Sequence, residues 1–404
     1  MKWNSIRTKV LVTLLGCLVV GVAGIVGLMR YSFERNSQAL AAESVTGAQK
    51  LFTILEAREI SKMTAVSEML ATNPQVRDAF AARDRERLLE LTAPLYPELK
   101  REGITNWMFH TPEPNMVVFL RLHNPSKFGD ALNRYIDKQV VSTHALVSGN
   151  ELAKAGFAVR ILRPFPDSTG GVAGYLELGE ELGQFIHTMK EQTGSDYGLL
   201  LNKNYMDRQF WADSSKVWKR RDDWDDNPNF VIADKTTADN SIFRFQGDLA
   251  NVPEHGEVLG RFQDGNSVFV RGIFPVRDAA GNTVGAMFVV RDISGFYVVM
   301  KHTQTVLVAL TIAALALVTV LVLTLLSRLV FRRLDHIVMV ATRVVGGDYK
   351  TAIHVSSDDE VGQFEQLFEQ FRQVFVDVLA HVPELQEQQP SAGAQAREAR
   401  AGTP

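Results

Sequence analysis

The chain has 404 residues, a formal net charge of −3 at pH 7 and one cysteine. Nearly balanced charge gives no sign of a nucleic-acid partner, because such partners are bound through basic patches that attract phosphates. The length predicts two or three modules rather than one small domain, and a single cysteine excludes an intramolecular disulfide.

Two apolar segments decide the broad class of the chain. Residues 10–29 and 303–327 contain no charged side chain, and about 20 apolar helical residues can cross a bilayer core of roughly 30 Å. A buried core helix is a poor alternative, because both segments are apolar on every face. A signal peptide cleaved at Ala39-Leu40-Ala41 also fits poorly, since the apolar segment exceeds the usual signal core of about 7–15 residues. We therefore predict two transmembrane helices.

Basic residues beside these segments predict their orientation. They are Lys2, Arg7 and Lys9 before the first segment, and Arg328, Arg332 and Arg333 after the second. Positive flanks are retained in the cytoplasm. We expect residues 1–9 and the part after 327 to be cytoplasmic in a bacterial inner membrane, with residues 30–302 outside the cytoplasm.

The segment 30–302 begins with helical patterns and continues with strand patterns. Residues 31–71 contain no proline and predict one long helix that stops at Asn73-Pro74, followed by a second helix that ends near Gly103. Short apolar runs between turn residues then predict strands. The predicted elements are strands at 116–123, 157–165, 172–179, 197–203, 265–276 and 283–292, a helix at 180–192, and a hairpin turn at 278–282 with Gly281 and Asn282 suited to positive φ. This order predicts an α+β fold, two successive modules on a helical stalk.

Several of these pieces resemble a known family. The segment Phe119–Asp130 (FLRLHNPSKFGD), Gly156 to Arg160, Gly174 to Gly179 and the closing hairpin Pro275–Asp292 are similar to double Cache sensor domains, PAS-like modules of chemoreceptors and sensor kinases. The resemblance covers about residues 31–300. It implies a small-molecule ligand in the membrane-distal module, about residues 100–180, with a proximal module at about 181–300.

Eight residues near the predicted strands combine aromatic walls with charged groups, as small-molecule pockets do. They are Trp107, Phe119, Arg121, His123, Arg134, Tyr135, Arg160 and Glu177. Arg121 and Arg160 are suited to clamp a carboxylate through two hydrogen bonds each. Two alternatives stay open: Arg121 and His123 on a solvated strand face, or Arg160 paired with Glu177.

Two other features are predicted to be structural. The histidines His110, His123 and His144 match no compact ligand spacing, so we expect no metal and no cofactor. The segment around Trp211, Trp218 and Trp224 is expected to be a solvated loop with packed aromatic side chains.

After the second apolar segment, apolar residues recur at intervals of three and four. They are Leu334, Ile337, Ala341 and Val344, and then Val361, Phe364, Phe368, Phe371, Phe375, Val378 and Val382. This spacing is typical of coiled-coil seams. Two short helices cannot bury such seams alone, so two copies are expected to form a parallel four-helix bundle. The alternative, an amphipathic pair packed on a globular domain, lacks such a domain in the sequence.

Residues 328–382 resemble a HAMP linker, a signal-relaying helix pair. The matching residues are Gly347, Tyr349, Ile353, Asp359, Glu360, Gly362, Phe364 and Phe368. The resemblance implies that Gly347 makes the turn, that Tyr349 and Ile353 pack on the bundle, and that Glu360 couples the helices. Two departures are Phe331–Leu334, where the family has a proline, and Glu369, where it has asparagine.

The tail, residues 383–404, is polar and is predicted to be disordered. It leaves too little chain for a kinase or cyclase, and no Walker loop, nucleophile elbow or zinc-protease motif occurs. We expect a non-enzymatic sensor that acts on a separate cytoplasmic or membrane signalling partner. The alternative is a membrane-anchored scaffold or regulatory subunit that binds a periplasmic protein or cell-wall component.

Overall fold

The computed structural model describes residues 6–153, 156–217 and 219–387. The chain divides into two compact units. The central unit is residues 29–303, and the terminal unit joins the residues before 29 to those after 303. Lys2, Trp218 and the tail from 388 onward lie outside the described residues.

The first helix, α1 (Ile6–Thr72), is continuous over 67 residues and includes the predicted helix 31–71. It ends where the Asn73 side chain accepts hydrogen bonds from the main-chain N–H groups of Gln75, at 3.0 Å, and Val76, at 3.4 Å. These bonds cap α2 (Pro74–Ala81). The predicted stop at Asn73-Pro74 is therefore confirmed, with asparagine as the cap and proline in the first turn.

The prediction of a single second helix that ends near Gly103 is wrong. Three short helices occupy this segment: α2, α3 (Arg85–Thr92) and α4 (Tyr96–Arg101). Asp84 starts α3 anew by accepting a 2.9 Å hydrogen bond from the Arg87 N–H. Pro94 separates α3 from α4, because proline has no N–H to donate to the preceding turn.

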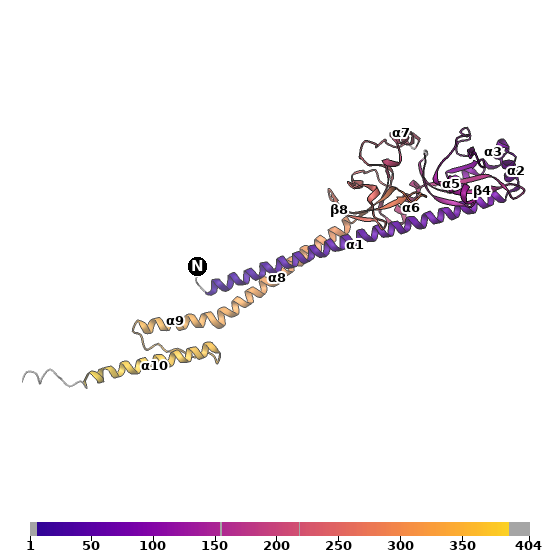
Figure 1. The fold of residues 1–404 in the computed structure, drawn as a ribbon. Coiled ribbons are helices and arrows are strands. Elements are labelled where there is room, and N and C mark those ends of the chain that lie inside the picture. Colours follow the sequence, from indigo (N-terminus) through magenta and orange to yellow (C-terminus); the bar gives the residue numbers. More distant parts are fainter. Residues whose placement is uncertain (1–5, 154–155, 218, 388–404) are drawn as a thin grey trace, which may run out of the picture. The chain divides into compact units, whose positions relative to one another are not determined.

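Two five-stranded antiparallel sheets form the body of the central unit (Figure 1). The first has the order β2-β1-β5-β4-β3, with β1 (Asn106–His110), β2 (Val118–Arg121), β3 (Val147–Ala153), β4 (Gly156–Pro166) and β5 (Val172–Glu181). The second has the order β7-β6-β10-β9-β8, with β6 (Asp196–Asn202), β7 (Phe230–Lys235), β8 (Glu257–Asp264), β9 (Ser267–Arg277) and β10 (Thr283–Asp292). Helices α5 (Tyr135–Thr143), α6 (Gly183–Thr193) and α7 (Arg208–Val217) lie between strands in the chain.

All six predicted strands are present, as β2, β4, β5, β6, β9 and β10, and the predicted helix at 180–192 is α6. The prediction missed β1, β3, β7 and β8 and the helices α5 and α7. Three of the missed strands lie at sheet edges, where one side of the strand has no neighbour and polar side chains are common. In the hairpin turn, Gly281 has φ +87°, whereas Asn282 does not adopt positive φ as predicted.

One apolar core joins α1 to both sheets. Phe52 of α1 packs on Phe185 of α6 and on Phe274 of β9, with ring centroids 5.8 and 5.9 Å apart. Further along α1, Met63 is fully buried in the same core, which continues to Phe109 of β1. Because burial of apolar surface is the main stabilising term in folding, α1 supports both sheets as one body.

The terminal unit contains the two apolar helical segments, the first part of α1 and most of α8 (Ser294–Leu326). Both are long and apolar enough to cross a membrane, and their most apolar windows are not buried in protein. An added Cβ on Gly21 would lie 3.8 Å from the Leu315 side chain. Small residues allow such close approach of helices.

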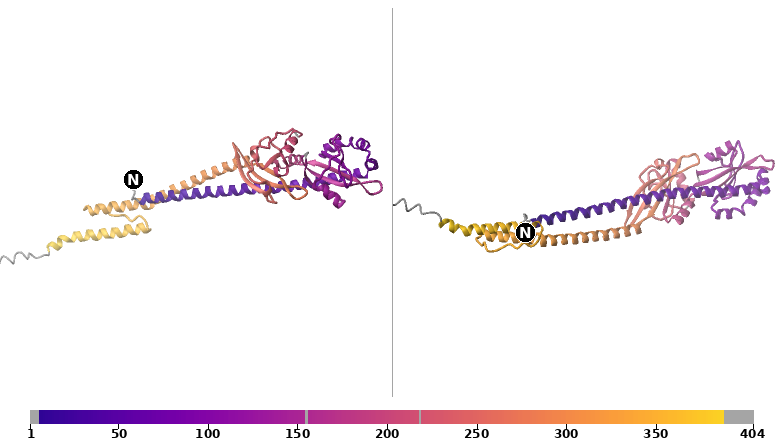
Figure 2. Two further views of the ribbon diagram at one scale, coloured as in Figure 1. Left: turned by 45° about the horizontal axis from the view of Figure 1, so that its top comes forward. Right: turned by 90° about the horizontal axis from the view of Figure 1, so that it is seen from below.

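A short π-helical turn (Ser327–Phe331) links α8 to α9 (Arg332–Val345), and a connector then leads to α10 (Glu360–Glu387). Figure 2 shows α9 and α10 side by side. Ile337 and Val340 of α9 form a small core with Ile353 of the connector, and Tyr349 and Phe368 pack against it. Gly347 makes the turn with φ +95°, and a Cβ on Gly362 would lie 1.7 Å from the Ser357 carbonyl oxygen, so only glycine fits there.

Charged contacts tie the connector to both helices. Arg333 of α9 bonds both carboxylate oxygens of Asp359, at 2.9 and 2.7 Å, and those of Glu365, each at 3.2 Å. Glu360, for which the resemblance implies a coupling role, is exposed, and that role stays a prediction. Glu369, the departure from the family's asparagine, accepts a 2.9 Å hydrogen bond from the Ile353 N–H. A hydrogen bond from Arg372 lowers the pKa of Glu369 to about 2.

Gly174 of β5 allows a first test of the fold. Its φ is +153°, and an added Cβ would lie 2.2 Å from the His110 carbonyl oxygen and 2.7 Å from Phe80 Cζ. We expect Gly174→Ala to lower the free energy of unfolding by about 3 kcal/mol or more, because backbone strain and a clash with main chain add together. Urea unfolding of the full chain in detergent, followed by tryptophan fluorescence, measures the loss.

Gly170→Ala is the matched control. Gly170 has φ +90° but no atom within 4 Å of an added Cβ, so only backbone strain of roughly 1–2 kcal/mol is expected. Equal losses in the two variants would contradict the close packing of β5 on β1.

Candidate functional site

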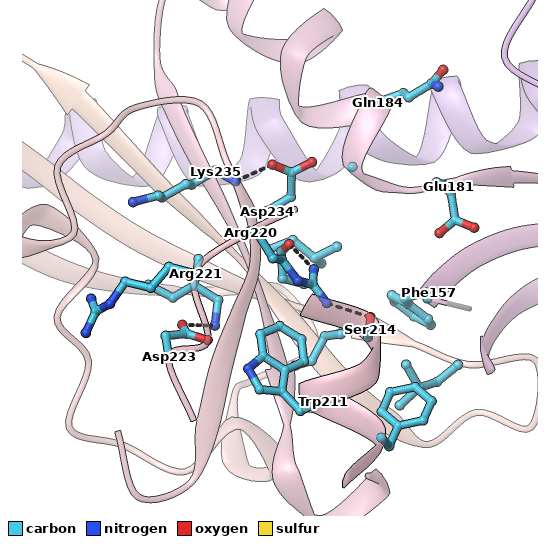
Figure 3. A pocket seen from close by; sticks show the side chains of 18 of the residues that line it. Phe157, Glu181, Gln184, Trp211, Ser214, Arg220, Arg221, Asp223, Asp234 and Lys235 are labelled. Carbon is cyan, nitrogen blue, oxygen red and sulfur yellow. Dashed lines mark hydrogen bonds between the residues drawn. The ribbon is translucent and has the colours of Figure 1, made fainter. Parts of the chain in front are cut away.

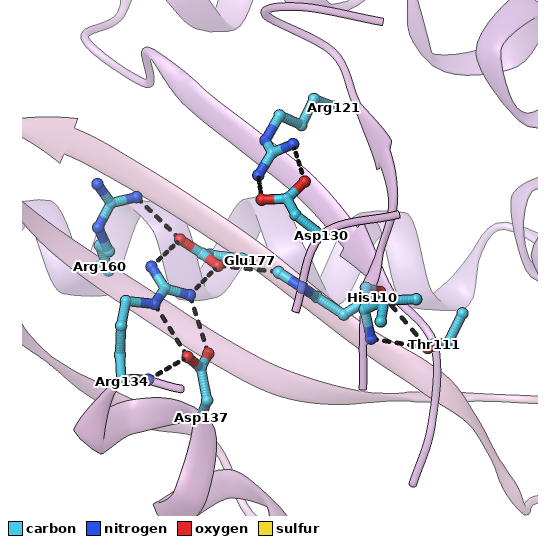
Figure 4. A network of polar contacts seen from close by, with 9 residues as sticks. His110, Thr111, Arg121, Asp130, Arg134, Asp137, Arg160 and Glu177 are labelled. Atoms are coloured by element: carbon cyan, nitrogen blue, oxygen red, sulfur yellow. Dashed lines mark hydrogen bonds and ion pairs between the residues drawn. The ribbon is translucent and has the colours of Figure 1, made fainter. Parts of the chain in front are cut away.

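A buried ionic network surrounds Glu177 of β5 (Figure 4). Its carboxylate accepts two hydrogen bonds from Arg134, at 2.9 and 2.6 Å, and one of 2.8 Å from Arg160 of β4. His110 Nε2 of β1 lies 2.9 Å from the same carboxylate. Arg134 also bonds both oxygens of Asp137 in the first turn of α5. The network therefore joins α5 to three adjacent strands.

The charges of this network balance one another. Burial alone would raise the pKa of Glu177, but the charge and hydrogen bonds of Arg134, with His110 and Arg160, hold that pKa well below its usual value. The pKa of Arg134 is raised, because attraction to Glu177 and Asp137 outweighs the effect of burial. Arg134 thus remains charged, and both guanidinium groups are bound to carboxylates of the chain itself.

The two arginines predicted to clamp a ligand hold different carboxylates. Arg160 pairs with Glu177, which was the open alternative, and Arg121 makes two 2.6 Å hydrogen bonds to Asp130. Burial and the positive charges of Arg121 and Arg160 lower the pKa of His123 to about 4. His123 is therefore a neutral imidazole near neutral pH. Both arginines are thus already paired with carboxylates of the chain, although Arg160 Nε has no hydrogen-bond partner among the described residues.

The remaining predicted residues have separate environments. Trp107 is fully buried in the core beside Phe109, with ring centroids 6.1 Å apart. Phe119 packs against Phe80, with ring centroids 5.7 Å apart. Tyr135, at the start of α5, is exposed. Contact of any of these side chains with a ligand stays a prediction.

The three histidines considered as metal ligands lie on different elements. His110 is bonded within the buried network, His123 follows β2, and His144 ends α5 with φ +50°. Among the described residues, no group of three or more His, Cys, Asp or Glu side chains has an arrangement that could hold a metal ion.

A cavity of about 500 Å³ lies at the junction of the two sheets (Figure 3). The first sheet contributes Phe157 and Glu181, at the ends of β4 and β5. The other walls come from the start of α6, from α7, from the loop that follows α7, and from β6 and β7. Small-molecule sites commonly have this size and lie between structural modules.

Arg220 and Trp211 form one wall of the cavity. The Arg220 guanidinium stacks on the fully buried Trp211 ring, 3.9 Å from its centroid. It donates hydrogen bonds to the Ser214 hydroxyl, at 2.8 Å, and to the Ala233 carbonyl. Arg220 Nε is buried and has no hydrogen-bond partner within the described ranges. Burial lowers the pKa of Arg220, but an arginine of even lowered pKa stays charged near neutral pH.

Three carboxylates also line the cavity. Each accepts one hydrogen bond from an amide group: Glu181 from the Asn106 side chain at 3.0 Å, Asp223 from the Ile232 N–H at 2.8 Å, and Asp234 from the Lys235 N–H at 2.7 Å. Burial raises the pKa of all three. Glycines make room for two of them, because a Cβ on Gly156 would lie 2.6 Å from Glu181 Oε2 and one on Gly183 would lie 2.2 Å from Asp234 Oδ2.

This cavity corrects the prediction of a solvated loop around Trp211 and Trp224. Trp211, Arg220 and Asp223 line the cavity instead. It also lies mostly beyond the distal module, about residues 100–180, where the resemblance implied a ligand. The sequence signal that was missed is the cluster of aromatic and charged residues between α7 and β7, which is unusual for a plain surface loop.

A third polar cluster connects the stalk to β5. Lys62 of α1 lies 3.0 Å from Glu180 and also bonds Glu59 of α1 and the Glu102 carbonyl. Burial and the hydrogen bond with Glu59 raise the pKa of Glu180 to about 7, although Lys62 acts in the opposite direction. The neutral form of Glu180 is therefore favoured in the folded chain.

The network around Glu177 predicts a large loss of stability in Glu177→Gln. The amide cannot balance Arg134 and Arg160, and breaking a buried pair typically costs about 3–5 kcal/mol. Glu90→Gln is the control, because Glu90 and its partner Arg87 are 68% and 53% exposed and such pairs contribute about 1 kcal/mol or less. Urea unfolding in detergent compares the two variants; a loss for Glu177→Gln no larger than that for Glu90→Gln would contradict a structural network.

The raised pKa of Glu180 predicts that the stability of the folded chain depends on pH. Its folded pKa, about 7, exceeds the ordinary 4.5, so the folded chain binds the proton more tightly than the unfolded chain does. The stabilising contribution is complete below pH 4.5 and is lost as pH rises through about 7. We expect Glu180→Gln to reduce the fall in Tm between about pH 5 and pH 8, as measured by thermal melts, whereas exposed Glu98→Gln should leave the fall unchanged. An unchanged fall in Glu180→Gln would refute the assignment.

A comparison with known proteins found one family model that matches part of the chain. Residues 43–217 match the family dCache_3, described as "Double sensory domain of two-component sensor kinase". The matched segment runs from α1 through the first sheet to the end of α7. No curated protein matches the chain.

Solved structures that match the chain include one periplasmic domain and one ligand-binding domain. The periplasmic domain of Vibrio cholerae LuxQ has 13% sequence identity and a TM-score of 0.38, over 61% of this chain and 97% of that one. The ligand-binding domain of the Campylobacter jejuni chemoreceptor Tlp3, in complex with L-norvaline, has 10% identity and a TM-score of 0.38, over 65% and 92%. Such distant likeness identifies no ligand for this chain. The family match and the two five-stranded sheets support a double Cache sensor domain in the central unit.

Proposed function

We propose that the chain is a transmembrane signal-transduction receptor that senses a small molecule outside the cytoplasm and relays its binding to a separate signalling partner. The observation that carries the proposal is the cavity of about 500 Å³, whose walls begin within the segment that matches a sensory family. Apolar walls with a few placed polar groups are typical of ligand sites. The proposed role is binding and relay rather than catalysis.

The two apolar helices support a membrane anchor. Both are long and apolar enough to cross a bilayer, and basic residues lie on the side that we assign to the cytoplasm, Lys9 before the first and Arg332 and Arg333 after the second. The positive-inside rule then assigns both termini to the cytoplasm of a bacterium and the central unit to the outer side of its inner membrane.

The contacts of the terminal unit support a HAMP-type relay in a homodimer. Gly347, Tyr349 and Ile353 have the turn and packing roles that the resemblance implies. Val361 and Phe368 face α9 within one chain. Four other seam residues of α10 are exposed: Phe364, Phe371, Phe375 and Val378. They recur at heptad spacing, so a second copy in parallel would cover them.

Signalling in this proposal is a shift between two packings. A ligand at the junction of the sheets contacts α6 and both sheets, which share one core with α1. Binding that favours one arrangement of these elements would shift the population of relay states through α8. The shift is limited by the difference in ligand affinity between the two states.

A ligand screen tests the proposal. Purified full-length chain in detergent is melted with amino acids, organic acids, amines and purines, and at least one class is expected to raise Tm saturably. Ala233→Phe should abolish the shift, because Ala233 lines the cavity and its carbonyl can still accept from Arg220. Ala238→Phe, at an exposed position, is the control and should keep the shift.

The contrary outcome is equally specific. If no compound shifts Tm, and crosslinking in cells retains a periplasmic protein or cell-wall fragment on the central unit, then the chain acts as a scaffold or regulatory subunit. A shift that persists in Ala233→Phe would instead move the ligand away from the cavity, to the residues around Glu177.

A further inference from the structure

Among the residues that the structure describes, the charged groups of the cavity are not balanced. Glu181, Asp223 and Asp234 line it, and none of the three has a lysine or arginine nitrogen within 4.0 Å among the described residues. His187 Nε2 lies 4.0 Å from Asp234 Oδ1. Asp223 is the buried one of the three, and a buried carboxylate in a folded protein is usually paired with a cation.

The cations of the cavity wall have partners elsewhere. Arg221 pairs with Asp226 at 2.8 Å, and the Lys235 ammonium donates to the Ala238 carbonyl at 3.0 Å and to the Asn240 side chain. Arg220 stacks on Trp211 and donates to Ser214 and Ala233. Within the described ranges, the Arg220 guanidinium is thus the only cation directed at the cavity interior. It stands against three carboxylates.

Asp223 is the strongest single indication of a ligand. It is only 5% exposed, yet its Oδ1 atom has no hydrogen-bond partner in the described part of the chain. Its other oxygen is held by the Ile232 N–H at 2.8 Å, which fixes the carboxylate at the cavity wall (Figure 3). A buried acceptor without a donor destabilises the folded chain, and more so when it is charged, so a cationic donor that reaches this oxygen from the cavity would be favoured.

Another part of the wall is apolar and aromatic. Phe157 and Phe210 lie on the cavity with Leu199 and Leu201 of β6. Such walls select an organic molecule over an inorganic cation, because a hydrated metal ion gains nothing from contact with phenyl and leucine side chains. About 500 Å³ accommodates a compound of one aromatic ring and a short chain.

We propose that the cavity at the junction of the two sheets binds an organic amine, with its ammonium group on Asp223 and the neighbouring carboxylates and its apolar part against Phe157 and Phe210. This inference rests on the proposed sensor function and names the ligand class for that site. It places recognition with the groups that line the junction, rather than with the arginines around Glu177, which hold carboxylates of the chain. Arg220 remains available to a carboxylate if the amine carries one.

The test uses four compounds that share one phenyl ring and differ in charge. They are phenethylamine, 2-phenylethanol, 3-phenylpropionate and phenylalanine, with 1,4-diaminobutane as an amine without a ring. Binding to the full-length chain in detergent is measured by calorimetry and by the shift in Tm. Phenethylamine is expected to bind saturably at millimolar concentration or below, at least tenfold more tightly than 2-phenylethanol, and 3-phenylpropionate is not expected to bind.

Two variants locate the ammonium group. Asp223→Asn keeps the acceptor for the Ile232 N–H and the side-chain volume but removes the charge, so the affinity for phenethylamine should fall at least tenfold. Asp234→Asn, at the more exposed side of the cavity, should weaken it less and serves if Asp223→Asn does not fold. Asp167→Asn, in the exposed turn between β4 and β5, is the matched control and should bind as the unmodified chain does.

The outcomes separate this inference from the sensor proposal. Saturable binding of the alcohol, of 3-phenylpropionate, or of phenylalanine without phenethylamine would overturn the amine assignment and leave the sensor proposal standing. The amine assignment would also be overturned if Asp223→Asn and Asp234→Asn bound phenethylamine as tightly as the unmodified chain does. If neither amine binds at millimolar concentration, the inference fails, and the broader compound screen then decides the sensor proposal.

Discussion

The apolar core along α1 is the constraint on which the central unit depends. Phe52 of α1 contacts Phe185 between the sheets and Phe274 in the second sheet, and Met63 continues the same core to the first sheet. Besides this shared core, Ala41 of α1 packs with Val268 and Val270 of β9 in a smaller cluster, so displacement of either sheet is felt at the helix. Because packed interiors change between discrete arrangements rather than deform smoothly, a small change at the junction of the sheets can be carried along α1.

Strand β5 connects the three polar clusters of the central unit. Successive side chains of a strand point to opposite faces, so Glu177 and Glu181 share one face and Glu180 lies on the other. Glu177 is held by Arg134 and Arg160, Glu181 lines the cavity, and Glu180 meets Lys62 of α1. The charge of Arg160 also acts on Glu181. A ligand in the cavity would thus act on a strand that is anchored to the stalk.

Much of this fold could be predicted from the sequence, because α1 and the six predicted strands carry regular apolar spacing and clear turn residues. The edge strands β3, β7 and β8 could not, since their exposed sides carry polar residues. Arg134, Arg160 and Glu177 were recognised as a candidate group, but their mutual pairing depends on strand register. The cavity was missed because Phe157, Glu181, Trp211 and Arg220 are far apart in the chain and meet only through the packing of both sheets.

The most direct test of the account concerns the two sides of the membrane. Cys17 is the only cysteine, so a Cys17→Ser chain can carry one new cysteine at an exposed position, Ala238→Cys in the central unit or Gln373→Cys in α10. Spheroplasts of a bacterial host are treated with a membrane-impermeant maleimide before or after lysis. The account predicts labelling at position 238 in intact spheroplasts and at position 373 only after lysis. Labelling at position 373 in intact spheroplasts, or at 238 only after lysis, would contradict it.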